Sequence, residues 1–438
     1  MSMGRRTLHL ALGTLALGAG LARASMGVAV VDGESVDFTS DERAVLLELS
    51  PLPAPPPDPT NAVYENEAAA RLGQALFFDS RLSADGSVSC ATCHAPEKSW
   101  TDHRVLGRGL SGLPRHTMTL WNVAYNRWFF WDGRKDTLWS QALGPLEDAR
   151  EHGTSRLAIL HLLASDAGYA RAWRDVFGPL PDLSDTRRFP PEGRPVPEDP
   201  RHPHAVAWNG MAAEDQALAT RVFVDVGKAI AAFERKLVSR SAPFDRFVEG
   251  LREGDAAKVA ALDASAQRGA RIFVGRGRCV FCHDGPNFTD LEFHDNRIPV
   301  GEEGGDPGRR LGIRRLRADP FNSQGEHADD GGTSGRIKLG FLVDDSHSGK
   351  QFKTPTLRNV ARTAPYMHEG QFATLAEVVR FYSRLTNASP EVPSERLVQP
   401  LDLDEGEEAD LVAFLESLTD ESLPPALLGP PPTPWLER

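Results

Sequence analysis

The motif Cys-X-X-Cys-His occurs twice in this chain and accounts for every cysteine in it. The two copies are Cys90–His94 and Cys279–His283, and the sequence has four cysteines in all. This motif is the attachment site of c-type haem, where two thiols add across the vinyl groups and the histidine binds the iron. A structural cysteine pair or a redox-active dithiol is the alternative, which the repetition disfavours. The sequence therefore predicts two covalent haem c groups, with His94 and His283 as iron ligands.

Length and charge limit the class of protein. A chain of 438 residues can form two domains with hydrophobic cores. Its 40% hydrophobic and 25% charged residues are typical of a soluble globular protein. The formal net charge of −12 argues against nucleic acid or an anionic membrane surface as the partner. Docking of a basic redox protein is compatible with this charge.

The N-terminus has the pattern of a signal peptide. Arg5 and Arg6 precede an apolar run over 8–21, and Ala22–Ala24 fits the small-residue cleavage rule. Cleavage there leaves Ser25 as the first residue, and no membrane anchor is expected afterwards. Export agrees with c-type haem, which is attached outside the cytoplasm, and it predicts the periplasm of a Gram-negative bacterium. The choice between the general and the twin-arginine export route stays open.

Hydrophobic periodicity predicts a mainly α-helical fold with little strand. Apolar residues recur at helical spacing before each haem motif, over 64–78 and 264–274. This parallel suggests two cytochrome c-like haem domains that arose by duplication. A long amphipathic helix is predicted over 218–237, and the Gly-, Asp- and Arg-rich residues 300–350 are interpreted as a long loop. The predicted division is a signal peptide (1–24), a leader (25–60), an N-terminal haem domain (61–242), a C-terminal haem domain (243–423) and a Pro-rich tail (424–438).

Four further segments resemble the bacterial dihaem cytochrome c peroxidase and MauG superfamily. They are Phe130–Arg134, Gln141–Pro145, Phe352–Val360 and Thr363–His368, and they occur in the order in which the family has them. The resemblance extends over about 60–420. It implies that the chain is a haem-dependent oxidoreductase of the peroxidase type, that its substrate is hydrogen peroxide, and that the first haem activates the peroxide.

The resemblance also implies an open first haem. Classical peroxidases of the family carry a histidine on the distal side of this haem, and the matching position here is Arg108, which cannot bind iron. We expect a first haem without a distal protein ligand. If a gap shifts the alignment, His103 or His116 is the ligand instead.

Three residues near the first haem follow from the same resemblance. Gln141 and Pro145 match the family at their own places, and the catalytic carboxylate of the family, ten residues after the glutamine, falls on Glu151. A carboxylate beside the iron can take a proton from one peroxide oxygen and deliver it to the other. Glu147 in the same acidic run is the alternative.

Two aromatic residues are assigned to the path between the haems and to the second iron. Trp131 corresponds to the tryptophan between the haems, where an indole can carry electrons or holes. Tyr382 follows the capping-box pattern Thr374–Glu377 and falls at the sixth-ligand position, where peroxidases have methionine and MauG-type enzymes have tyrosine. A phenolate favours higher oxidation states of iron than a thioether does. Met367 is the alternative ligand.

The resemblance implies a calcium ion between the domains, but it leaves the ion in doubt. Two carbonyl ligands map to Thr363 and Pro365, whereas the asparagine ligand of the family is His116 here. Imidazole is a poor ligand for calcium, and Asn122 or water is the substitute to consider.

Two enzymatic functions follow, together with a weaker non-enzymatic one. A MauG-like enzyme would use peroxide to oxidise Trp or Tyr residues of a periplasmic protein substrate, and Tyr382 and the absent distal histidine favour this function. A cytochrome c peroxidase would instead reduce peroxide to water with electrons from a small cytochrome or cupredoxin. An electron-transfer dihaem cytochrome is disfavoured by Glu151 and the open iron.

Overall fold

The computed structural model describes residues 36–299, 305–344, 348–390 and 398–432. The predicted signal peptide (1–24) lies outside the described residues. Helices dominate the described part, and its one sheet pairs two short antiparallel strands, β1 (Phe293–His294) and β2 (Phe352–Lys353). The prediction of a mainly helical fold with little strand is confirmed. None of the described helices is long and apolar enough to cross a membrane.

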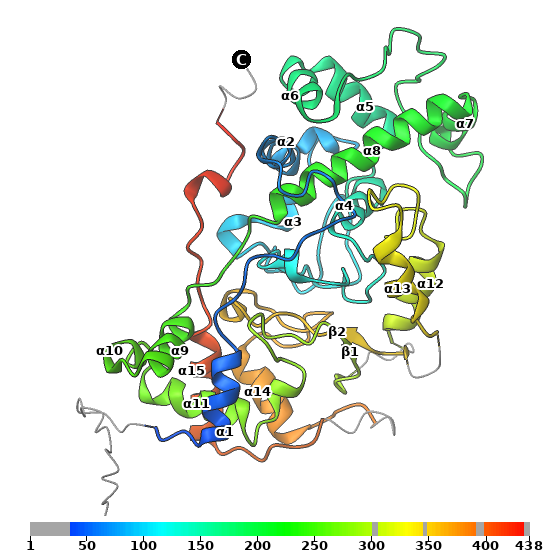
Figure 1. The fold of residues 1–438 in the computed structure, drawn as a ribbon. Helices are drawn as coiled ribbons and strands as arrows, with labels where there is room; N and C mark the ends of the chain where they lie inside the picture. The colour runs from blue at the N-terminus through cyan, green and yellow to red at the C-terminus, as the bar shows by residue number, and fades with distance from the viewer. Residues whose placement is uncertain (1–35, 300–304, 345–347, 391–397, 433–438) are drawn as a thin grey trace, which may run out of the picture. The chain divides into compact units, whose positions relative to one another are not determined.

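The N-terminal half is built around α8 (Ala213–Glu234), the long helix that the periodicity predicts. Its buried face packs on α2 (Glu67–Phe78) and α4 (Leu138–Glu147), as Figure 1 shows. Large side chains from these helices and from the aromatic segment around Trp121 and Trp139 form one core. The other helices of this half are α3 (Cys90–Cys93), α5 (Arg156–Ser165), α6 (Ala167–Phe177) and α7 (Pro203–Asn209).

The C-terminal half has a second core of its own, centred on the packing of α11 (Ala264–Val274) against α15 (Glu405–Glu416). Phe244, Phe273 and Phe414 are fully or almost fully buried there. Pro243 begins α9, and the division of the chain into domains at 243 stays a prediction. The other helices of this half are α9 (Pro243–Glu253), α10 (Ala256–Val259), α12 (Gly308–Ala318), α13 (Thr333–Gly340) and α14 (Leu375–Arg384).

Each end of the described chain packs on the opposite half of the protein: the leader on the C-terminal half and the tail on the N-terminal half. The leader forms α1 (Ser40–Glu48), and its Leu46 is completely buried in the C-terminal core. The tail makes a short 3-10 turn, Pro425–Leu427, and Leu427 packs on the N-terminal core. The side chain of Gln74 on α2 donates to two carbonyl oxygens of this tail, each at 2.6 Å. The tail is therefore turned and packed, where the sequence indicated only a Pro-rich extension.

The interpretation of residues 300–350 as a long loop is wrong, because α12 and α13 lie within them. Ile313 and Leu316 lie on the inner face of α12 and are 2% and 0% exposed. A Cβ at Gly312 would lie 2.0 Å from the carbonyl oxygen of Asp132, so only glycine permits this close packing. The arginines of α12 hid this narrow apolar stripe, because most of them extend from the outer face of the helix.

Candidate haem sites and the residues around them

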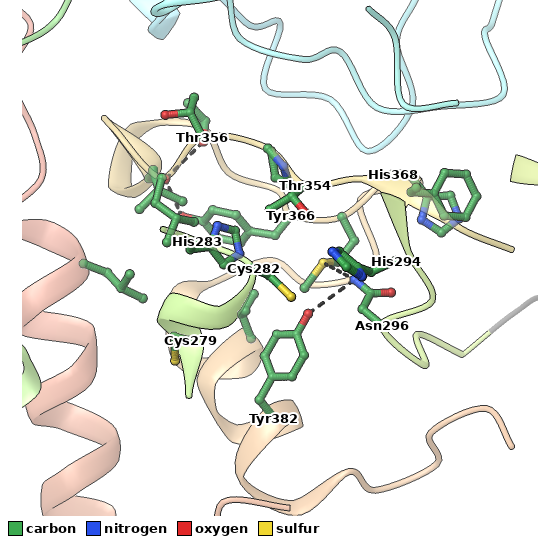
Figure 2. A pocket seen from close by; sticks show the side chains of 18 of the residues that line it. Cys279, Cys282, His283, His294, Asn296, Thr354, Thr356, Tyr366, His368 and Tyr382 are labelled. Carbon is green, nitrogen blue, oxygen red and sulfur yellow. Dashed lines mark hydrogen bonds between the residues drawn. The ribbon is translucent and has the colours of Figure 1, made fainter. Parts of the chain in front are cut away.

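The second Cys-X-X-Cys-His motif borders a cavity of about 280 Å³. The motif follows α11, and the sulfur atoms of Cys279 and Cys282 are in no disulfide. The ring of His283 donates from Nδ1 to the carbonyl oxygen of Phe288 at 2.9 Å, which leaves Nε2 free to bind a metal. Figure 2 shows the two cysteines and His283 around this cavity. Free thiols beside an oriented histidine are what covalent attachment of haem c requires.

Tyr382 lies in the same cavity and comes from α14. The helix begins at the capping box of Thr374 and Glu377, as predicted. The Oη atom of Tyr382 accepts a hydrogen bond from Nδ2 of Asn296 at 3.3 Å, which Figure 2 marks with a dashed line. The Sδ atom of Met367 lies 3.8 Å from the same nitrogen. Both candidate sixth ligands therefore line the cavity, and both contact one amide.

The first motif is organised in the same way as the second. Cys90–Cys93 forms the short helix α3, and Nδ1 of His94 donates to the carbonyl oxygen of Trp100 at 3.1 Å. A donating Nδ1 makes Nε2 the ring nitrogen whose lone pair can bind iron, as in His283. The Sγ atom of Cys93 lies 3.4 Å from the carbonyl oxygen of Arg108. The backbone at Arg108 therefore lies beside the thiol that would hold the first haem.

Glu151 is half-buried and lies against the loop that contains Arg108. The amide of Leu110 donates to the carbonyl oxygen of Glu151 at 3.1 Å, and a Cβ at Gly109 would lie 2.5 Å from the Cα atom of Glu151. Burial, and then the charge of Asp148, raise the pKa of the Glu151 carboxyl to about 7. The structure thus brings Glu151 and the first motif to the same loop, and the carboxyl can hold or release a proton near neutral pH.

Three other candidate residues, Gln141, Pro145 and Glu147, lie on α4, and their side chains have different surroundings. Oε1 of Gln141 is buried and has no hydrogen-bond partner among the described residues. Pro145 lies within the helix, and its carbonyl oxygen accepts from the amide of His152 at 3.1 Å. Glu147, the alternative to Glu151, forms an ion pair with Arg156 at 2.9 Å. Both carboxylate oxygens of Glu147 are thus engaged by the Arg156 guanidinium.

The alternative distal ligands of the first haem are engaged elsewhere. His103 is exposed, and its Nε2 atom bonds to the carbonyl oxygen of Arg362 at 2.9 Å. His116 lines the cavity of the second motif, and its Nδ1 atom donates to the carbonyl oxygen of Arg104 at 2.7 Å. The side chain of Arg108 is exposed. None of these positions supports a histidine on the first iron, and the open first haem stays a prediction.

Trp131 is held at the wall of the second cavity. Its Nε1 atom donates to the carbonyl oxygen of His116 at 2.9 Å, and its ring meets that of His368 edge-on at 6.5 Å. The His368 ring in turn stacks on Phe352 at 3.6 Å. Asp132, the next residue, is completely buried and forms ion pairs with Arg115 and Arg134. The segment that presents Trp131 is therefore fixed by both an indole hydrogen bond and buried charges.

Comparison with known proteins gives one consistent result. The model of the family described as di-haem cytochrome c peroxidase matches residues 67–253. The methylamine utilization protein MauG of Methylorubrum extorquens is 32% identical over 91% of this chain and 91% of its own. The cytochrome-c peroxidase IdrP1 of a Pseudomonas species is 30% identical over 87% of each chain. The chain belongs to the dihaem cytochrome c peroxidase and MauG family.

Solved structures agree with this assignment. A MauG-like protein associated with microbial copper homeostasis is 27% identical, with a TM-score of 0.58 over 87% of this chain and 98% of its own. The diheme peroxidase BthA from Burkholderia thailandensis, 23% identical with a TM-score of 0.59 over 87% of this chain and 92% of its own, has the same fold. The protein is thus a haem-dependent oxidoreductase, and membership of a dihaem family accounts for both Cys-X-X-Cys-His motifs.

Some residues at these family sites carry no local signal in the sequence. Asn296 lies in a loop after β1, and only the fold brings its amide to Tyr382. His152 is buried, and its Nδ1 atom donates to the carbonyl oxygen of Leu82 at 3.0 Å beside the first motif. Glu234 could have been found, because it falls on the apolar stripe of α8 between Ile230 and Leu237, where a carboxylate is unexpected.

The residues at the predicted calcium position fit the ion poorly. His116 directs its ring at the carbonyl oxygen of Arg104, and its backbone amide donates to the carbonyl oxygen of His368 at 2.8 Å. Asn122 lies elsewhere in the fold, and its side-chain oxygen accepts from the amide of Ser239 at 2.8 Å. Thr363 and Pro365 line the cavity together with His116, whose imidazole stands where the resemblance implies an asparagine ligand. The imidazole of His116 therefore bonds to the backbone of Arg104 at the position where the resemblance implies a calcium ligand.

We therefore predict that the isolated enzyme does not need calcium. Treatment with a calcium chelator should leave its optical spectrum and its activity unchanged, and metal analysis should find less than one calcium ion per chain. His116→Asn restores an oxygen ligand and should make the spectrum respond to added calcium. Loss of activity in the chelated wild-type enzyme, restored by calcium, would contradict this prediction.

Proposed function

We propose that this protein is a periplasmic, MauG-like enzyme that uses hydrogen peroxide to oxidise Trp or Tyr side chains of a protein substrate. The observation that carries the proposal is Tyr382, which lines the second cavity and accepts a hydrogen bond from Asn296. A phenolate at the sixth position of the second haem stabilises oxidised iron, whereas the thioether of an electron-entry haem stabilises reduced iron. The similarity to MauG over nearly the whole chain supports the same conclusion.

The residues divide the chemistry between them. Haem held by Cys90, Cys93 and His94 would supply the iron at which peroxide is reduced. Glu151, with a pKa of about 7, takes the proton of one peroxide oxygen and returns it to the other, which leaves as water. Gln141 offers its unpartnered Oε1 atom to the same site. The protein substrate loses two electrons and two protons, so each peroxide yields two waters.

Trp131 is the route by which oxidising equivalents pass between the two haem sites in this proposal. Its indole is held by the hydrogen bond to His116, and its ring meets the stacked pair of His368 and Phe352. A fixed orientation keeps the aromatic path constant, so that a charge can pass without rearrangement of the protein. Tyr382, whose oxygen accepts a hydrogen bond from Asn296, would hold the iron of the second haem and favour its oxidised form.

Trp131→Phe should slow oxidation of a protein substrate by more than tenfold while both haems remain attached. Phenylalanine keeps the ring but loses the hydrogen bond to His116, and it is harder to oxidise than indole. The measurement is the rate of substrate oxidation after one equivalent of peroxide, with Trp128→Phe as the control for loss of an indole elsewhere. Equal rates in wild type and Trp131→Phe would remove Trp131 from the path.

One experiment separates this function from its competitor. Stoichiometric peroxide is added to the diferric protein, and its optical and EPR spectra are followed with time. A long-lived oxidised state with little turnover of reduced cytochrome c supports the proposal. Fast turnover of a reduced cytochrome or cupredoxin, seen only after one-electron reduction of the enzyme, contradicts it. That result would favour a cytochrome c peroxidase, which the similarity to IdrP1 keeps as the second candidate.

A further inference from the structure

Each haem-binding half contains a helix crossing of the same kind. These two crossings allow the halves to be aligned residue by residue. In the N-terminal half, a Cβ at Gly73 of α2 would lie 1.8 Å from the carbonyl oxygen of Ala229 on α8. In the C-terminal half, a Cβ at Gly269 of α11 would lie 1.9 Å from the carbonyl oxygen of Asp410 on α15. Since no side chain fits at either crossing, both helix pairs meet at a glycine. Ala229 and Asp410 are therefore equivalent positions.

This alignment places a carboxyl group where the other half has leucine. Four residues beyond the crossings lie Phe233 and Phe414, which are both completely buried. The next residues are Glu234 in the N-terminal half and Leu415 in the C-terminal half. Leu415 lines the cavity of the second haem motif. Glu234 accordingly belongs to the equivalent wall of the first haem site.

The electrostatics of the first motif agree with this placement. After burial, the negative charge of Glu234 is the largest influence that raises the pKa of the Cys90 thiol. In the second motif, no carboxylate acts on Cys279. Glu234 thus acts on the sulfur of Cys90, whereas no carboxylate among the described residues contributes in this way to the raised pKa of the Cys279 thiol.

Glu234 itself is buried without a partner. Its side chain is only 4% exposed, and its Oε2 atom has no hydrogen-bond partner among the described residues. Burial alone raises the pKa of this carboxyl to about 8, and no cation offsets it.

The charged groups on the elements packed against α8 are engaged elsewhere or exposed. On α2, Glu67 forms an ion pair with Lys236 and Arg71 is exposed. On α4 and α5, Glu147 pairs with Arg156. His161 on α5 bonds to the carbonyl oxygens of Phe189 and Pro190. The Cys90 thiol of α3 is therefore the titratable group on these elements that Glu234 acts on.

We infer that Glu234 is the proton acceptor coupled to reduction of the first haem. When a one-electron donor reduces the iron, the positive charge at the haem falls by one, and an ionised carboxyl in this buried position becomes more costly. Glu234 then takes one proton from solvent onto its carboxylate oxygen. On oxidation of the iron, the electron leaves to the acceptor and Glu234 returns the proton to water.

This inference goes beyond the proposed function, because it concerns only how the first haem gains and loses an electron. It requires haem on Cys90 and Cys93, and it holds whether the enzyme oxidises a protein or a small redox donor. Peroxide and protein substrate are absent from its test. The test can therefore fail while the proposed function stands, and the reverse is also true.

The test is a redox titration of the dihaem holoprotein at several pH values. In wild type, the midpoint potential of one haem should fall as pH rises, by up to about 59 mV for each tenfold change in proton concentration, since one electron is coupled to one proton. Glu234→Gln is neutral at every pH. In this variant the midpoint potential of that haem should stay near its low-pH value and should no longer depend on pH. Glu214→Gln on the exposed start of α8 is the matched control and should keep the slope.

Other variants decide between Glu234 and its neighbours. Glu151→Gln should keep a slope, although Glu151 also titrates near neutral pH. Loss of the slope in Glu151→Gln together with its retention in Glu234→Gln would overturn the inference. If Glu234→Gln does not load haem, Glu234→Leu copies the second site and should also remove the slope. The reverse change, Leu415→Glu, should give the second haem a slope that it lacks in wild type.

Discussion

Glu151→Gln should lose peroxide-dependent activity by a factor on the order of 10²–10⁴, the range that a positioned acid or base contributes. Both haems should remain attached, because Glu151 contacts neither Cys-X-X-Cys-His motif through a hydrogen bond of its side chain. The amide of glutamine occupies the same volume but cannot take a proton from peroxide. The measurement is the rate of the reaction of the diferric protein with peroxide, together with the haem content of each variant.

The pH dependence gives a second test of the same residue. Burial raises the pKa of Glu151 to about 7, so the ionised form that accepts a proton predominates above that pH and is lost below it. The rate should therefore fall as pH decreases through about 7 in wild type, and Glu151→Gln should show no such fall. Glu151→Asp should regain part of the rate with a shifted profile. If Glu147→Gln is the inactive variant instead, the proton carrier is Glu147.

The sequence was most informative where function depends on short spacings. Each haem motif fixes two thiols and a histidine within five residues, and the structure adds only that a backbone carbonyl orients each histidine ring. The same holds for α14, because its capping box defines the start of the helix and hence the turn on which Tyr382 lies. Such features depend on local geometry, and local geometry can be inferred from residue types.

Long-range contacts could not be inferred in this way. Asn296 reaches Tyr382 across 86 positions of the chain, and no pattern near either residue indicates their contact. The packing of Leu46 on the C-terminal core is similar, since the residues of the short helix α1 do not indicate which half of the protein it contacts. The error over 300–350 has another cause. Ile313 and Leu316 are the large apolar residues on the buried face of α12, and they are too few to dominate the arginine-rich composition of the helix.

The histidine at position 116 illustrates the limit of reasoning from resemblance. The family implies an asparagine ligand there, and the sequence could report only that imidazole is unsuited to calcium. In the structure His116 has another role. Its ring bonds to the backbone carbonyl of Arg104, and its own backbone carbonyl accepts a hydrogen bond from the indole of Trp131. A substitution at a family position can thus replace a metal contact by a hydrogen bond while it keeps the neighbouring tryptophan in place.

Tyr382→Met should raise the midpoint potential of the second haem by on the order of 0.1 V or more, within the range of about 0.8 V over which axial ligands set haem potentials. If Tyr382 is the sixth ligand, as we propose, a thioether that stabilises reduced iron replaces a phenolate that stabilises oxidised iron. The optical and EPR signature of that haem should change as well. Oxidation of a protein substrate should fall, while turnover with a reduced small donor should persist, because the second haem would then accept electrons readily.

Two further variants show whether such a change arises at the ligand or from a disturbed fold. Tyr382→Phe removes the oxygen but keeps the ring, so it should alter the ligand spectrum as Tyr382→Met does. Asn296→Leu keeps the tyrosine but removes the amide 3.3 Å from its oxygen, and it should shift the potential by less, because the iron keeps its ligand. If Tyr382→Phe leaves the spectrum unchanged and Met367→Leu alters it, the sixth ligand is Met367. The second haem would then resemble an electron-entry haem, and the argument for protein oxidation would lose its main support.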